Sequence, residues 1–525
     1  MSKIDNLIAF DDYTIQERGW KQGFSINYTM SQLEKEPRLE VIIMPFSHND
    51  PGWLKTFEEY FEESTDAVIT SSRKLLPLLK DLTFVWSEIT FLDLWWTTHN
   101  ESDRLAFKRS VRNGQMEILT GSWVMADEAG SHYFSTIMQL SEGHDPTMAY
   151  LLKECHIEHM VIQRVHYAVK KYLAKHRQLE FYWRQFWAGE DSKYDTFTHM
   201  LPFDSYDYTK SCGPDPEVCC QFEFRKLGKN CNEGGTPIVE IVSDNVKQKS
   251  NLLADQYRKK AQLYKSNVVL VPHGMDFMWS TEEEWKNEHK NLAELIKYIN
   301  ENEQEYHIHA RFGTLKDYFA IVEKRIKDNH TALPTLSGDF LPYADKLDEY
   351  WSGYFTSRPF HKHLDRSVQN YLRSADILFS MANQKCSARV RERLTRRWLS
   401  LFQHHDAIAG TSRKKVMDDY ANKMVTAIKS SQQVIEKSAS YLLNMGSAKD
   451  NVLDVNEEYF FDKLPRQKIV KINSSFLLFN SLTFEREEVM CIWWTLLIVK
   501  YTTNHLGKMF HGQPATNQSI LHHRH

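Results

Sequence analysis

Long apolar runs are missing from the 525-residue sequence. The N-terminus, MSKIDNLIAFDDYTIQERGW, lacks an apolar segment of the length that a secretory signal peptide requires. The apolar stretch from Cys491 to Val499 is far shorter than the roughly 20 residues that a helix needs to cross a bilayer. We therefore expect neither a signal peptide nor a membrane anchor in the sequence as written.

A large excess of charge is also missing, because 65 Lys and Arg residues oppose 69 Asp and Glu residues and leave a net charge of −4. Such a chain produces no overall field that would favour nucleic acid or an anionic membrane. A neutral or polar partner suits it better. Aromatic residues make up 13% of the chain, and their rings pack in protein cores about as often as they stack on the apolar faces of sugars.

Four of the seven cysteines, Cys212, Cys219, Cys220 and Cys231, lie within twenty residues of one another. They could form a zinc site or a disulfide-stapled loop. Adjacent cysteines do not easily serve one tetrahedral ion, so disulfides are favoured. N-glycosylation acceptor triplets (sequons) also agree with a protein of an oxidising, glycosylating lumen. The alternative is a cytosolic protein with reduced cysteines, in which the sequons arose by chance. The five sequons begin at Asn27, Asn100, Asn329, Asn473 and Asn517.

Up to about residue 345, apolar β-type runs alternate with amphipathic helical patterns such as residues 53–79 and 132–140. This alternation predicts a parallel sheet or barrel, in which functional groups gather where strands end. The predicted strands are residues 39–46, 84–90, 116–124, 159–164, 181–185 and 268–272.

The later chain has a different texture. Residues 365–445 carry long charged helical patterns and predict a helical bundle, and residues after 451 return to short β-type segments. The predicted fold is α/β, with a parallel β/α barrel-like catalytic domain followed by a helical bundle and the start of a β-rich domain. The expected divisions are an N-terminal extension at 1–38, the catalytic domain at 39–345, the bundle at 346–450 and the truncated β-rich domain at 451–525.

The motif His48-Asn-Asp50-Pro-Gly-Trp53 directly follows an apolar strand. Residues two apart in extended chain point the same way, so His48 and Asp50 can reach one metal ion. The segment Gln403-His-His405-Asp406 supplies further polar groups in an apolar setting. A helix terminus capped by Gly410 is the alternative reading of that segment.

Asp127 and Asp276 each follow a predicted strand. Carboxylates at the ends of different strands converge at a barrel mouth, as glycosidase chemistry requires. Either acid could instead cap the helix that follows it.

Many segments, in order, resemble the α-mannosidases of glycoside hydrolase family 38, and within that family the Golgi α-mannosidase II type. They include HNDPGW, GSWVMADEA, QRVHYAVKK, the cysteine-rich SYDYTKSCGPDPEVCCQFEF, ARFGTLKDYF, YWSGYFTSRP and QHHDAIAGT. The resemblance runs from about residue 20 to residue 445 and implies a zinc-dependent retaining glycosidase.

The resemblance also implies roles for individual residues. It makes Asp127 the nucleophile and Asp276 the general acid and base. The implied zinc ligands are His48, Asp50, Asp127 and His405. The implied mannose contacts are Trp53, Tyr206, Asp207, Trp351 and Asp406, and the implied disulfides are Cys212–Cys219 and Cys220–Cys231.

The expected partner is an N-linked glycan in the Golgi lumen, trimmed at α1,3- and α1,6-linked mannose, with no nucleic acid. A membrane anchor is expected only in a longer parent chain. The oligomeric state is left open, with a homodimer as the candidate.

Three departures from the family pattern are visible. A segment with a W-A-x-D-P-F-G-H motif is missing after His144, Met275 replaces an acid, and the chain ends soon after the bundle. The alternative function is accordingly an inactive or sugar-binding relative that keeps the zinc site without turnover.

Overall fold

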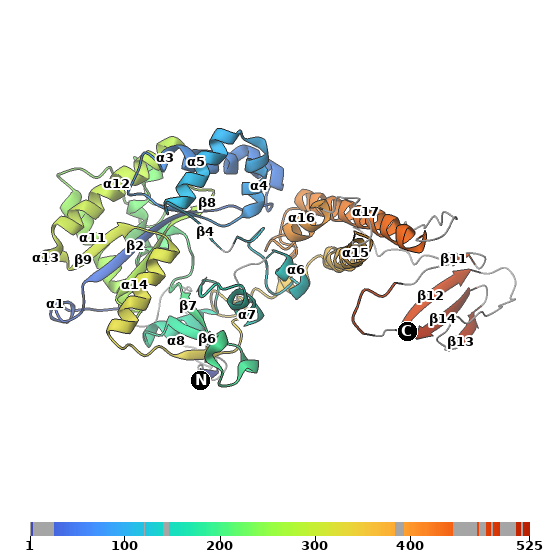
Figure 1. Ribbon diagram of the computed structural model, residues 1–525. Helices are drawn as coiled ribbons and strands as arrows, with labels where there is room; N and C mark the ends of the chain where they lie inside the picture. The colour runs from blue at the N-terminus through green and yellow to red at the C-terminus, as the bar shows by residue number, and fades with distance from the viewer. Residues whose placement is uncertain are drawn as a thin grey trace. The chain divides into compact units, whose positions relative to one another are not determined.

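The computed structural model describes residues 2–3, 26–119, 121–139, 146–383, 393–444, 470–471, 479–484, 487–493, 511–515 and 518–524 (Figure 1). Two compact units are present. The first contains residues 1–357 and 403–416, and the second contains residues 358–402 and 417–525. None of the helices described is both long enough and apolar enough to cross a membrane.

The central sheet of the first unit is parallel throughout, in the order β4-β3-β2-β8, with β9 also paired to β2. The apolar run LEVIIMPF forms most of β2, whose residues are almost all buried, as expected for a strand covered on both faces. In register, β2 and β8 pair from Glu40 with Val268 to His48 with Asp276. The strands are β2 (Leu39–His48), β3 (Phe84–Trp86), β4 (Met116–Ile118), β8 (Val268–Asp276) and β9 (Ile308–Phe312).

A second sheet has the order β1-β10-β6-β7-β5. Its pairs are parallel except for β6 with β7, which is antiparallel. Its members are β1 (Ser2–Lys3), β5 (His159–Ile162), β6 (Glu180–Arg184), β7 (Thr196–Met200) and β10 (Thr335–Ser337).

Helices connect and cover these strands (Figure 1). Their starts carry the expected signals: Thr281 accepts the amide of Glu284 at the start of α12, where three glutamates follow. The longer helices are α3 (Asp66–Leu75), α4 (Ile89–Thr98), α5 (Glu101–Arg112), α8 (Tyr167–Lys175), α11 (Val246–Ala261), α12 (Glu282–Glu301) and α14 (Leu315–Asp328). The shorter ones are α1 (Met30–Leu33), α2 (Phe57–Tyr60), α6 (Tyr133–Gln139), α7 (Pro146–Glu154), α9 (Tyr208–Ser211), α10 (Pro216–Cys219) and α13 (Glu303–Tyr306).

The second unit contains three longer helices, α15 (Pro359–Asn383), α16 (Arg393–Phe402) and most of α17 (Lys414–Asn444). Its short sheet consists of β11 (Val470–Lys471), β12 (Glu487–Trp493), β13 (His511–Ala515) and β14 (Gln518–Arg524). The predicted α/β catalytic part followed by a helical region is thus confirmed. The proposed domain boundaries stay predictions.

Two predicted strands end four or more residues earlier than expected. The strand expected at 84–90 stops at Trp86, because Glu88 caps α4. The strand expected at 116–124 stops at Ile118, and Gly121 turns the chain with a φ of +72°. Strands β7, β9 and β10 were not predicted. The gap expected after His144 lies outside the described residues.

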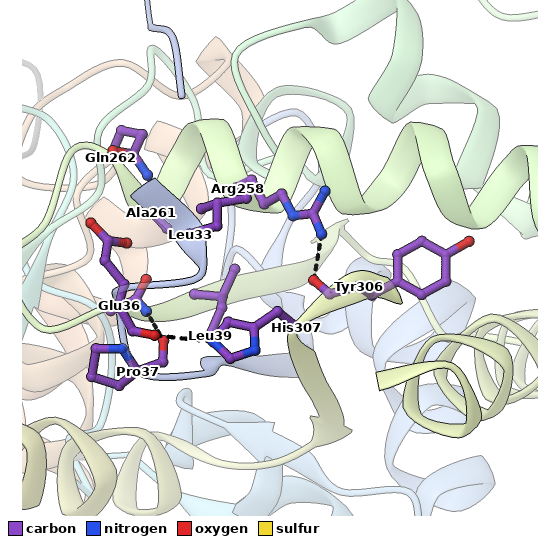
Figure 2. A pocket seen from close by; sticks show the side chains of 10 residues that line it. Leu33, Glu36, Pro37, Leu39, Arg258, Ala261, Gln262, Tyr306 and His307 are labelled. Carbon is purple, nitrogen blue, oxygen red and sulfur yellow. Dashed lines mark hydrogen bonds between the residues drawn. The ribbon is translucent and has the colours of Figure 1, made fainter. Parts of the chain in front are cut away.

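A small cavity of about 10 Å³ lies between the start of β2 and helix α11 (Figure 2). Nε2 of His307 lies 3.0 Å from the carbonyl oxygen of Glu36, and the guanidinium of Arg258 donates to the carbonyl of Tyr306. A space of this size holds about one water molecule, so this small cavity is structural rather than a ligand site.

Candidate functional site

A cavity of about 510 Å³ opens in the first unit where strands of the central sheet end. His48 at the end of β2, Glu88 beyond β3 and Asp276 at the end of β8 line it, together with His405 and Asp406 from residues 403–416. This placement follows from topology, because the carboxyl ends of parallel strands meet at one edge of a sheet.

The end of β2 brings His48 and Asp50 together as the spacing predicted. Nε2 of His48 lies 2.9 Å from Oδ1 of Asp50, and the two side chains are only 8% and 4% exposed. Pro51 and Gly52 then turn the chain, with Gly52 at a φ of +115°, a conformation that residues with a side chain rarely adopt.

Residues 403–405 reach the site by pairing with residues 125–127. The amide of Asp127 donates to the carbonyl of Gln403 at 2.9 Å, and Ala126 and His404 form an antiparallel bridge. Nδ1 of His405 lies 3.0 Å from the carbonyl oxygen of Met125. A proton on Nδ1 therefore makes this hydrogen bond, and Nε2 of His405 is left with its lone pair, 3.5 Å from Oδ1 of Asp50.

Four residues offer donor atoms that all lie within 4.8 Å of one another: Asp50, His404, His405 and Asp406. Oδ1 of Asp50 and both ring nitrogens of His404 make no hydrogen bond to any described residue, although they are buried. Buried polar atoms that make no hydrogen bond are costly even where an oppositely charged group lies near, as Nε2 of His48 does for Oδ1 of Asp50. Converging carboxylate and imidazole donors are ligands that Zn²⁺ prefers. The residues present therefore fit a divalent metal ion.

The charges at this site are strongly coupled. Burial alone would lower the pKa of His48, but the carboxylates of Asp50 and Glu88 raise it to about 10. Burial favours protonation of Asp50, yet the neighbouring His48 holds the pKa of that carboxyl well below its usual range. Burial raises the pKa of Glu88 to about 7.

Asp127 lines the same cavity and is buried. Among the described residues, however, it does not belong to the four-residue donor group. Its Oδ2 accepts the amide of Gly130 at 2.6 Å, as a turn-capping carboxylate does. Burial and the Asp127 carboxylate raise the pKa of Tyr354.

Asp276 is exposed to the cavity and accepts a hydrogen bond from the hydroxyl of Tyr206. Burial and this neighbouring carboxylate raise the pKa of Tyr206. Asp207 lies next to Tyr206 at the start of α9, and burial followed by the charge of Asp276 raises its pKa. The hydroxyl of Tyr206 therefore orients the carboxylate of Asp276.

The other predicted sugar contacts also lie at the cavity. Trp53 and Trp351 line it, and Trp351 is 43% exposed. The guanidinium of Arg164 lies 5.1 Å from the centre of the Trp351 ring. Asp406 accepts a 2.6 Å hydrogen bond from Thr411 while its Oδ2 faces Nε2 of His405 at 3.7 Å.

Three residues of this site carried no individual role in the sequence interpretation: His404, Glu88 and Tyr354. His404 was covered only by the general interpretation of its segment, in which one histidine could bind a metal ion while its neighbours orient it or bind substrate. Glu88 and Tyr354 gave no local signal, because the significance of the buried Glu88 and the half-buried Tyr354 comes from residues far away in the sequence.

The cysteine-rich segment forms the two disulfides that the resemblance implied, Cys212–Cys219 and Cys220–Cys231. They staple the short helices α9 and α10 beside the cavity-lining strand β8, against which α9 packs. The disulfide interpretation of these cysteines is therefore confirmed, and the metal alternative is not needed for them.

Comparisons with known proteins agree with this architecture. The glycosyl hydrolases family 38 N-terminal domain matches residues 38–145 and 141–346, and the alpha mannosidase middle domain matches residues 349–442. A solved alpha-mannosidase from Enterococcus faecalis V583 has a TM-score of 0.56 at 13% identity, covering 77% of this chain and 43% of its own. At that identity the likeness shows the fold alone.

Relatives of higher identity are named Alpha-mannosidase 2. The protein of Drosophila melanogaster is 42% identical over 476 residues, which cover 85% of this chain and 42% of the relative. The protein of Homo sapiens is 39% identical over 545 residues, covering 94% of this chain and 47% of the relative. The chain thus spans about half the length of the curated relatives that it matches.

Proposed function

The chain belongs to glycosyl hydrolase family 38, and from this premise we propose that it carries a zinc-dependent α-mannosidase site. The observation that carries the proposal is the convergence of Asp50 and His405 beside His48 in a cavity that aromatic rings line, among them the exposed Trp351. Enclosed donors with one open side suit an ion that must also contact a substrate.

On the family resemblance, His48, Asp50 and His405 would hold the ion. Asp50 and His405 belong to the four-residue donor group, while His48 stands outside it with Nε2 2.9 Å from Oδ1 of Asp50. The fourth ligand is Asp127 according to the family resemblance, and Asp406 is the candidate that the donor group favours. When bound there, Zn²⁺ would act as a Lewis acid and as a template for sugar hydroxyls.

The protein groups supply the remaining chemistry. We assign Asp127 as the nucleophile that attacks the anomeric carbon, and Asp276 as the acid that protonates the leaving oxygen. Water then reverses the sequence with Asp276 as base, so configuration is retained. The hydroxyl of Tyr206 orients Asp276. Trp53, Trp351, Asp207 and Asp406 would contact the mannose ring.

The proposed substrate is a terminal α1,3- or α1,6-linked mannose of an N-linked glycan, processed in the Golgi lumen. The two disulfides agree with an oxidising compartment. Sequons at Asn100 and Asn329 lie on exposed residues, where a glycan can be attached.

A second candidate function is sugar binding without turnover. The observation that favours it is the local engagement of Asp127, whose Oδ2 is taken by Gly130 and which stands outside the donor group found among the described residues. A carboxylate held in a turn is poorly placed to attack a sugar. Under this reading the chain keeps the metal and the glycan contacts but lacks an effective nucleophile.

The test measures zinc content and hydrolysis of a chromogenic α-mannoside by the purified chain and by Asp127→Ala. Turnover by the parent chain with one zinc, abolished in the variant, supports the hydrolase. Stoichiometric zinc and saturable mannoside binding with no turnover in either protein establishes the second function. A chain that binds neither zinc nor mannoside refutes both.

A further inference from the structure

Glu88 is a buried acid at the cavity that the proposed chemistry does not use. The residue is 1% exposed and lines the cavity beside the donor group. Neither oxygen of its carboxylate makes a hydrogen bond of standard geometry to a described residue, although the backbone amides of Asn49 and of Glu88 itself approach it. A buried carboxylate in this condition costs free energy, and so it calls for an explanation.

The imidazole of His48 lies within ion-pair distance of this carboxylate. Oε1 of Glu88 lies 3.6 Å from Nδ1 of His48, while the opposite ring nitrogen, Nε2, lies 2.9 Å from Asp50. The His48 ring is therefore placed between two carboxylates. A movement of about half an ångström would bring Nδ1 and Oε1 to hydrogen-bond distance.

The backbone of Glu88 is held firmly where β3 gives way to α4. Glu88 is the N-cap residue of α4, and its carbonyl accepts the indole N–H of Trp86 at 3.0 Å and the amide of Phe91 at 3.3 Å. The ring of Trp86 is itself buried. Because the backbone of Glu88 is already held in place, its side chain loses little further conformational entropy when it orients the His48 ring.

We propose that Glu88 is a positioning residue of the metal site, whose carboxylate accepts the Nδ1 proton of His48 and so holds Nε2 toward Asp50 and the ion. The inference rests on the proposed function for the metal, but the pairing of Glu88 with His48 belongs to the chain itself. Histidines that bind metals commonly donate their second N–H to a carboxylate, and losing that partner weakens metal affinity about 10- to 100-fold.

Two substitutions separate this role from others. Glu88→Met removes the acceptor at similar length, and Glu88→Gln keeps an acceptor oxygen without the charge. Asp93→Met is the control, because Asp93 lies on the same helix and does not line the cavity. Chelator competition measures zinc affinity, and circular dichroism checks the fold of each variant.

We expect zinc affinity to fall about 10- to 100-fold in Glu88→Met, and to stay within about threefold of the parent in Glu88→Gln and in the control. Unchanged affinity in Glu88→Met overturns the proposal. Equal losses in Glu88→Met and Glu88→Gln also overturn it, since they would indicate a direct ligand or a role of the charge alone.

A second measurement uses the unsubstituted chain and needs no variant of Glu88 to fold. In protein labelled with ¹⁵N-histidine, the His48 signals are assigned by their loss in His48→Asn. We expect the proton of His48 to reside on Nδ1 when zinc is bound, and a proton on Nε2 overturns the proposal.

The same labelled protein distinguishes the two failures. If the chain binds no zinc, the proposed function fails, and the metal-free spectrum still decides the pairing. A slowly exchanging Nδ1 proton on His48 supports the pairing, and a rapidly exchanging one refutes it.

Discussion

The hydroxyl of Tyr206 donates a 2.7 Å hydrogen bond to Oδ1 of Asp276, and the ring of the same tyrosine lies 5.4 Å from the ring of His48. Tyr206 thus links the proposed general acid to the side of the cavity where we propose that the metal ion binds. Asp276 and His48 are also register partners at the ends of β8 and β2. The sheet therefore fixes the distance between the two halves of the site.

Replacing Tyr206 by Phe tests whether its hydroxyl orients Asp276 for catalysis without contributing to zinc binding. A hydrogen bond to a charged group contributes about 1.5 to 3 kcal/mol, so we expect kcat for an α-mannoside to fall about 10- to 100-fold. The zinc content of Tyr206→Phe should equal that of the parent chain, because the hydroxyl of Tyr206 is not a proposed zinc ligand. Steady-state kinetics with metal analysis checks this, and Tyr182→Phe, outside the cavity, is the matched control. Unchanged kcat would remove Tyr206 from the mechanism.

Asp127 and Asp406 are the two candidates for the fourth ligand of the proposed metal ion. If Asp127 binds the ion, Asp127→Asn lowers zinc affinity more than Asp406→Asn does. If the donor group around Asp50 represents the ligand set, the order is reversed. We expect the variant that lacks the true ligand to bind zinc about tenfold or more weakly than the parent chain. Zinc titration of both variants against the parent chain decides between the two ligand sets.

Gly274 of β8 packs directly against the backbone of β2 at Phe46. A Cβ added there would meet the carbonyl oxygen of Phe46 at 2.0 Å, and a backbone atom cannot move aside easily. We expect Gly274→Ala to destabilise the chain by about 3 kcal/mol or more, measured by urea unfolding. Gly353→Ala is the control, because an added Cβ there meets no atom within 4 Å. Equal stability of the two variants would contradict the register described for β2 and β8.

Lys260 gives a pH dependence of known sign. Its ammonium group is fully buried and donates to the carbonyls of Ser211 and Leu270, and burial lowers its pKa from 10.5 to about 7. Between these values the unfolded chain binds more protons than the folded chain, so stability rises as pH increases from about 7 to about 10. Below about pH 7, Lys260 is charged in both states, so the folded chain carries the full destabilisation from burying this charge.

Urea unfolding at several pH values checks this dependence. We expect the rise of unfolding free energy between pH 7 and pH 9 to be smaller in Lys260→Met than in the parent chain. Lys316→Met, on an exposed residue, should keep the slope of the parent. Parallel curves for the parent chain and Lys260→Met would show that Lys260 stays charged in the folded state.

Continuous apolar sequence predicted the central strands well, because β2 and β8 are buried on both faces and read as apolar runs. The sequence IHARF of β9 carries two polar side chains and lacks such a run, so that strand was missed. Strand β10 has only three residues and gives no usable period. Both strands exist because a neighbouring strand offers them backbone partners, which is a tertiary effect.

The site was predictable where spacing alone aligns the donors, as in His48 and Asp50. Its remaining geometry depends on pairing between residues 125–127 and 403–405, which no local pattern encodes. That pairing orients His405 through Met125 and also brings His404 to Asp50. Resemblance to a family could suggest the residues, but not which of them lie within reach of one another.

The fourteen residues from Gln403 to Val416 belong to the first unit, although α15, α16 and most of α17 around them belong to the second. On a ribosome, β2 and β8 emerge long before His405 does. A nascent chain that stops short of residue 403 would thus have a nearly complete sheet but would lack His405, one of the proposed metal ligands. Site assembly is accordingly a late event of biosynthesis, dependent on contacts of very high sequence separation, and a translation product ending at residue 357 should show the fold of the first unit without retaining metal.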